Sequence, residues 1–87
     1  MDYKEHILHS VIRQVLLTNR HKKGLSQTAL SMITNTTRQF ISQIEVGKRQ
    51  PSLTSLSNFA AAIDKTLTEL FQEIDELYID LDSRNKD

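Results

Sequence analysis

The chain has 87 residues, of which 38% are hydrophobic and 25% are charged, and it contains no cysteine. This length predicts one domain with a small core, and the lack of cysteine excludes disulfides and thiolate metal sites. No apolar run approaches the roughly 18 residues that a membrane-spanning helix needs, and the N-terminus lacks the features of a signal peptide. We therefore expect a soluble, cytoplasmic protein.

The charged residues are unevenly distributed, although the net charge is zero. Residues 1–54 carry eight basic and three acidic side chains, whereas residues 55–87 carry three basic and eight acidic ones. Net charges of +5 and −5 in the two halves indicate one face for a polyanion and another that is kept away from it. The alternative is that the acidic half only aids solubility.

Apolar residues at a spacing of four predict a first helix over residues 5–21. Its last turn is basic and is followed by Gly24, and both features favour a helix end. Ser26 is suited to cap a second helix over residues 27–33. Three side chains of the second helix are expected to face inward: Ala29, Leu30 and Ile33.

A third helix over residues 38–45 is predicted by the cap residue Thr37 and by Gly47 after its end. The turn before it contains Asn35, which tolerates positive φ. One face of this helix is apolar and the other carries polar side chains whose forked groups fit base edges in a DNA major groove. The polar face consists of Arg38, Gln39, Ser42 and Gln43, and the apolar face of Phe40, Ile41 and Ile44.

Two more helices complete an all-α fold. Pro51 and Ser52 precede a fourth helix with an apolar stripe, and Thr66 with Glu69 forms a capping box for a fifth. We expect the fifth helix to end near residue 81, residues 1–81 to form a single domain, and the polar residues 82–87 to be disordered.

The fifth helix carries a heptad pattern of apolar residues, which is typical of a seam between two helices. Because a contiguous exposed apolar patch usually marks an interface, we expect this helix to pair with a second copy of the chain. The alternative is that it folds back on the first helix. The predicted dimer interface consists of Leu70, Ile74, Leu77, Tyr78 and Leu81.

Five motifs, in the same order and at similar spacing, resemble the Xre/Cro-type (lambda-repressor-like) helix-turn-helix family over about residues 12–71. They are Gly24-Leu25-Ser26-Gln27, Ile41-Ser42-Gln43-Ile44-Glu45, Gly47-Lys48-Arg49, Pro51-Ser52-Leu53 and Leu67-Thr68-Glu69-Leu70-Phe71. The resemblance implies that the third helix contacts bases and that the loop after it contacts phosphates. It also implies that Arg20 and Glu45 form a buried, architectural ion pair. The implied DNA-binding residues are Gln27, Thr37, Arg38, Gln39, Ser42, Gln43, Lys48 and Arg49.

The turn between the second and third helices departs from the family pattern. Thr34 and Thr36 stand where the family normally has leucine and valine, so their hydroxyls need hydrogen-bond partners. Otherwise the turn packs loosely and Ile33 takes over part of the burial. Asn35 replaces the usual glycine, Ser31 the customary alanine, and Ala29 a common glutamate. These changes affect local stability and leave the base-contacting face intact.

Metal binding and catalysis are not indicated by the sequence. His6 and His9 could share a helix face, but neither they nor His21 has further ligands at suitable spacing. No nucleophile–histidine set, phosphate-binding glycine loop or catalytic carboxylate pair is present. We therefore expect no cofactor and no enzyme activity. The predicted function is a homodimeric transcriptional regulator on palindromic double-stranded DNA, and the alternative is an antitoxin-like protein-interaction module.

Overall fold

Each helix of this chain begins after a residue whose side chain caps it. The computed structural model describes residues 2–84. Within that range there are five helices and no strand: α1 (Tyr3–Lys22), α2 (Gln27–Ile33), α3 (Arg38–Glu45), α4 (Leu53–Ala62) and α5 (Leu67–Arg84). The cap side chains that accept a backbone N–H bond belong to Asp2, Ser26, Thr37, Ser52 and Thr66. The all-α prediction is confirmed, and the predicted bounds of α2 and α3 agree with the structure.

The capping box of α5 has both of its predicted hydrogen bonds. The Glu69 N–H donates to Thr66 Oγ1 (3.0 Å), and the Thr66 N–H donates to Glu69 Oε1 (2.9 Å). The pKa of the Glu69 carboxyl is lowered, mainly by the hydrogen bond from the Thr66 backbone and also by the one from the Thr66 hydroxyl.

The turn between α2 and α3 satisfies its own polar groups. Asn35 has a φ of 54°, in the left-handed region predicted for it. The Thr34 hydroxyl lies 2.8 Å from the Leu30 carbonyl oxygen and 2.9 Å from the Thr36 hydroxyl. Because these bonds satisfy the polar groups of the turn, Ile33 does not have to be buried there in place of the two threonines. It is 57% exposed, so the prediction that it faces inward is wrong.

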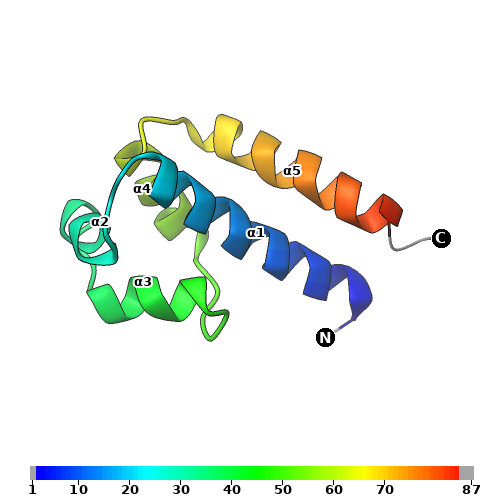
Figure 1. Cartoon of the computed structure of the whole chain (residues 1–87), viewed down its shortest axis with the longest axis horizontal. Coiled ribbons are helices and arrows are strands. Elements are labelled where there is room, and N and C mark those ends of the chain that lie inside the picture. The colour runs from blue at the N-terminus through cyan, green and yellow to red at the C-terminus, as the bar shows by residue number, and fades with distance from the viewer. Residues whose placement is uncertain (1, 85–87) are drawn as a thin grey trace.

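All five helices contribute buried side chains to the core, and α2, α3 and α4 are gathered around the C-terminal half of α1 (Figure 1). Helices α1 and α5 run antiparallel and side by side along the long axis of the molecule (Figure 1). The most completely buried large side chains are Val11, Leu16, Leu30 and Leu70.

The contact between α5 and α1 corrects part of the predicted dimer interface. Leu70 is fully buried and Ile74 is 6% exposed, both in the core of one protomer. Helix α1 is 20 residues long, and its N-terminal half supplies Ile7 and Val11 to the core that also holds Leu70 and Ile74. The alternative that α5 folds back is therefore the one observed, and the assignment of Leu70 and Ile74 to an interface between copies is wrong.

The rest of the predicted seam is only partly covered. Leu77, Tyr78 and Leu81 are half-buried and pack against the edge of the core. Since each retains some exposed surface, a role for these three residues in dimerisation stays a prediction.

Helix α5 also extends further than predicted. It continues to Arg84, whose guanidinium pairs with Asp80 one turn earlier (3.2 Å). A cation in the last turn and an i,i+4 ion pair both favour helix, so the predicted start of a disordered tail at Asp82 is wrong. Residues 85–87 of that tail lie outside the described residues.

A polar network joins the C-terminal half of α1 to the start of α5. Lys65 Nζ donates to Asn19 Oδ1 (2.8 Å) and to Glu73 Oε2, and Asn19 Nδ2 donates to Glu73 Oε1 (3.2 Å). Burial raises the pKa of Glu73, but the bonds from Lys65 and Asn19 and the charges of Lys65 and Lys22 outweigh it, so the net pKa is lowered.

This network predicts a pH-dependent contribution to stability. Because the folded pKa of Glu73 is depressed, its contribution is present above the unfolded pKa of about 4.3 and is lost as the pH falls through the folded value. We expect Glu73→Gln to lower the free energy of unfolding at pH 7 by less than about 1 kcal/mol, since the carboxylate is partly exposed.

The difference between wild type and Glu73→Gln should shrink as the pH falls from 5 to 3, measured by urea unfolding. The matched control is Glu76→Gln, which removes one carboxylate from α5 but leaves the Lys65–Glu73 pair in place. A difference that grew at low pH would contradict this sign.

Candidate nucleic-acid interface

Helix α3 separates its side chains into a buried face and an outer face. Ile41 and Ile44 are 3% and 6% exposed and pack into the core. The outer face carries Arg38 and Gln39, which are exposed, and Ser42 and Gln43, which are half-buried. Because α3 lies at the edge of the molecule opposite α5 (Figure 1), this polar face is turned away from the rest of the chain.

Thr37 fixes where the outer face begins. Its side chain accepts a hydrogen bond from the Phe40 N–H (3.0 Å), so Arg38 and Gln39 lie in the first turn of the helix. The hydroxyl therefore has a capping role whether or not it also contacts DNA.

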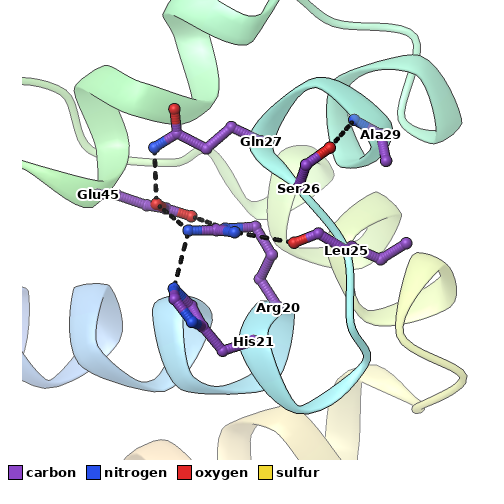
Figure 2. A network of polar contacts seen from close by, with 7 residues as sticks. All are labelled: Arg20, His21, Leu25, Ser26, Gln27, Ala29 and Glu45. Atoms are coloured by element: carbon purple, nitrogen blue, oxygen red, sulfur yellow. Dashed lines mark hydrogen bonds and ion pairs between the residues drawn. The ribbon is translucent and has the colours of Figure 1, made fainter.

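A buried ion pair holds the C-terminal end of α3 against α1. Arg20 Nε lies 2.6 Å from Glu45 Oε2, and Arg20 Nη2 lies 2.9 Å from Glu45 Oε1. The side chains are 10% and 5% exposed. Two parallel N–H···O bonds form the forked pairing that a guanidinium makes best with a carboxylate. The geometry agrees with the predicted architectural pair, and the two side chains are directed toward each other (Figure 2).

Two further N–H donors of Arg20 also have partners. Nη1 donates to the Leu25 carbonyl oxygen (2.8 Å), and Nη2 also contacts His21 Nε2 (3.1 Å). Since an arginine can only donate, the His21 nitrogen accepts this bond. The Arg20 side chain thus connects α1, the α1–α2 loop and α3, as Figure 2 shows. The sequence motifs indicated Glu45 as a partner but gave no signal for His21 or the Leu25 carbonyl.

Gln27 attaches α2 to the same ion pair. Its Nε2 donates to Glu45 Oε1 (2.9 Å), so one carboxylate accepts bonds from both α1 and α2 (Figure 2). This contact braces α3 against the first turn of α2. Contact with a phosphate stays a prediction for this residue.

The loop after α3 folds back on the helix. The N–H groups of Lys48 and Arg49 both donate to the Gln43 carbonyl oxygen, at 2.8 and 3.2 Å. Gly47 makes this turn possible with a φ of +83°, and a Cβ there would lie 2.5 Å from Arg13 Nη1. The positive φ favours glycine at this position, whereas the flexible end of Arg13, a neighbour that the sequence did not indicate, could move aside.

Side chains of this loop also contact the outer face of α3. Arg49 Nε donates to Gln43 Oε1 (3.2 Å), and the guanidinium carbon lies 5.4 Å from the centre of the Phe40 ring. The attraction between a cation and an aromatic face favours this placement. Arg49 is therefore fixed beside Gln43, a contact that no motif spacing indicated.

Charge is divided in space as it is along the sequence. Helix α3 and its loop carry Arg38, Lys48 and Arg49 at one edge of the molecule, and the acidic helix α5 forms the opposite edge (Figure 1). An anion approaching α3 meets cationic groups first, and the acidic side chains lie far from it. Within residues 2–84 no helix is long and apolar enough to cross a membrane, and no cluster of potential metal ligands is found there.

An outward-facing polar helix, braced by a second short helix and flanked by basic residues, defines a helix-turn-helix DNA-binding protein. A sequence model of the helix-turn-helix family matches residues 16–70, more than half of the chain. The chain belongs to the Xre/lambda-repressor-like helix-turn-helix family of DNA-binding transcription regulators, a family of regulators and not of enzymes.

Known proteins agree with this assignment. The chain is 37% identical over 57 residues to control protein C.MunI from Mycoplasma sp, covering 66% of this chain and 77% of that protein. A T36A mutant of the restriction-modification controller protein C.Esp1396I superposes with a TM-score of 0.78 at 25% identity, over 84% of this chain and 97% of that one. The clp gene regulator ClgR from Corynebacterium glutamicum shares the fold, with a TM-score of 0.81 at 16% identity, over 91% of this chain and 84% of that one.

The ion pair predicts that removal of one partner destabilises the protein more than removal of both. Arg20→Met leaves the Glu45 charge buried without its main partner, which costs about 3–5 kcal/mol of unfolding free energy. The double variant Arg20→Met/Glu45→Leu removes both charges and should recover much of that loss. Chemical denaturation of the wild type, both single variants and the double variant measures the coupling. Additive effects of the two single substitutions would contradict the pairing.

Proposed function

We propose that the protein is a homodimeric transcriptional regulator that binds a near-palindromic operator in the cytoplasm. The observation that carries the proposal is the outer face of α3, where Arg38 and Gln39 are exposed and Gln43 is half-buried. The helix is held at its start by the Thr37 cap and at its end by the bonds to Glu45. Arginine donors suit guanine, and a free glutamine amide suits adenine. The resemblance to control protein C.MunI and to the controller protein C.Esp1396I supports a regulator of this type.

Phosphate contacts would come from groups around α3. Lys48, at the turn after the helix, is exposed, and Arg49 lies beside Gln43. Gln27, Thr37 and Ser42 have polar side chains close to the same surface. Such contacts fix the orientation of the protein on the duplex, whereas base contacts set its sequence preference.

A surface for dimerisation lies between the N-terminal half of α1 and α5. A groove of about 750 Å³ there is lined by apolar side chains of both helices. Phe71 and Leu8 are 39% and 38% exposed, although both are large and apolar. Its apolar lining residues with exposed surface are Leu8, Phe71 and Tyr78, whereas Ile74, which also lines it, is 6% exposed and belongs to the core.

The occupant that fits this groove is a second copy of the chain. The groove is also lined by Lys4 and by the acidic residues Asp2, Glu5 and Asp75. In a two-fold arrangement the same patch meets itself, so Lys4 of each protomer can face Asp75 of its partner. Simultaneous binding of two half-sites requires the two α3 helices to lie about 34 Å apart, one helical turn of DNA.

A selection from random DNA duplexes tests the regulator function. The purified protein should enrich a palindromic site, and its binding should weaken steeply with salt because phosphate contacts release counterions. Arg38→Ala should relax the preference at one position in each half-site and cost about 1–3 kcal/mol there. Failure of the wild type to enrich any sequence would overturn the proposed function.

Sedimentation tests the dimer. The wild type should sediment as twice the 10.0 kDa protomer. Phe71→Glu places a charge in the apolar groove and should give monomers with an unchanged helical circular-dichroism spectrum. Leu53→Glu is the matched control, since Leu53 is 63% exposed on α4 and outside the groove. A Phe71→Glu variant that remained dimeric would exclude this surface as the interface.

A further inference from the structure

The side chains of Arg49 and Gln43 form a connected pair at the C-terminal end of α3. Arg49 Nε donates to Gln43 Oε1 (3.2 Å), and the Arg49 N–H donates to the Gln43 carbonyl oxygen (3.2 Å). The Phe40 ring lies under the guanidinium, 5.4 Å from ring centre to Cζ. Three contacts to one helix thus hold Arg49 in place, although the residue itself is in a loop.

This pair restricts what Gln43 can offer to a ligand. A guanidinium has only donors, so the group that faces Arg49 must be the amide oxygen of Gln43. The amide nitrogen with its two hydrogens is therefore turned away from Arg49. The positive charge beside Oε1 also opposes the approach of a second donor to that oxygen. The free end of Gln43 is a hydrogen-bond donor.

We infer that Arg49 is a positioning residue that makes Gln43 a donor to a keto oxygen on a DNA base edge, either O6 of guanine or O4 of thymine. This inference rests on the proposed function and refines it at one position. An unrestrained glutamine pairs with adenine by accepting from N6 and donating to N7. With its oxygen held by Arg49, Gln43 cannot accept the bond from adenine N6 and keeps at most a bond to N7, so the two-bond pairing with adenine is lost, and a donor facing the amino group of cytosine is unfavourable.

Gln39 provides an internal comparison on the same helix. It is exposed in the first turn of α3, and no hydrogen bond of its side chain is recorded within residues 2–84. Its amide is free to turn, so Gln39 can pair with adenine through both its oxygen and its nitrogen. The same residue type thus has two different base preferences, set by whether an arginine lies beside it.

The test uses the operator recovered by selection and base analogues within it. The position contacted by Gln43 is the one whose preference disappears in Gln43→Ala. There, guanine is replaced by 2-aminopurine, which lacks O6, or thymine by 5-methyl-2-pyrimidinone, which lacks O4. Loss of the keto oxygen should weaken wild-type binding roughly 2- to 12-fold, the worth of one hydrogen bond. The analogue that weakens binding identifies the base.

Two neighbouring variants separate positioning from simple charge. Arg49→Met releases the Gln43 amide, so keto dependence should fall to less than about 2-fold and adenine should become accepted at that position. Lys48→Met removes one positive charge from the same loop without altering the Gln43 side-chain contact. It should lower affinity for all sequences alike and keep the keto dependence. Gln43→Ala should be insensitive to the analogues.

Two results would overturn the inference. One is an Arg49→Met protein that loses affinity uniformly and keeps its keto dependence, as Lys48→Met is expected to do. The other is a wild type whose binding depends on the amino group at that base pair and not on the keto oxygen. Either result leaves the proposed function intact, because both require a selected operator. A wild type that selects no operator would instead refute the proposed function and this inference with it.

Discussion

The buried ion pair between Arg20 and Glu45 is the contact on which the geometry of the DNA-binding unit depends. Glu45 is the last residue of α3, Arg20 lies near the end of α1, and Gln27 is the first residue of α2. One carboxylate therefore fixes three helices relative to one another. Burying two charges is costly unless further hydrogen bonds compensate for the lost hydration, and here the backbone carbonyl of Leu25 and the ring of His21 accept two further bonds from Arg20. The pair thus gives α3 a defined orientation more than it adds net stability.

With α3 fixed in this way, its outer face can be organised in detail. The turn at Gly47 brings Arg49 back over Phe40 and beside Gln43, so the loop contributes both charge and hydrogen-bond direction to the helix surface. The acidic residues are concentrated in α5 at the opposite edge (Figure 1). Because the chain has no net charge, this separation is what gives α3 its favourable field for a polyanion.

Much of the fold could be predicted because its signals are local. Caps such as Ser26 and Thr37, the positive φ of Asn35 and the capping box at Thr66 depend on residues three or fewer apart. The partner of α5 could not be predicted from its heptad pattern, because an apolar stripe fits α1 of the same chain as well as a second copy. Leu70 and Ile74 were for that reason assigned to the wrong interface.

The candidate site shows the same limit. Motifs indicated which residue types lie on α3, but the contact from Arg49 to Gln43 depends on how the loop after α3 folds back on the helix.

The central claim is that α3 and its loop are the surface that DNA contacts. An NMR titration of the wild type with its selected operator tests this most directly. We predict that the amide resonances of residues 37–49 shift most on addition of DNA and that those of residues 75–84 shift least. The largest shifts on α5, with α3 unaffected, would contradict the account.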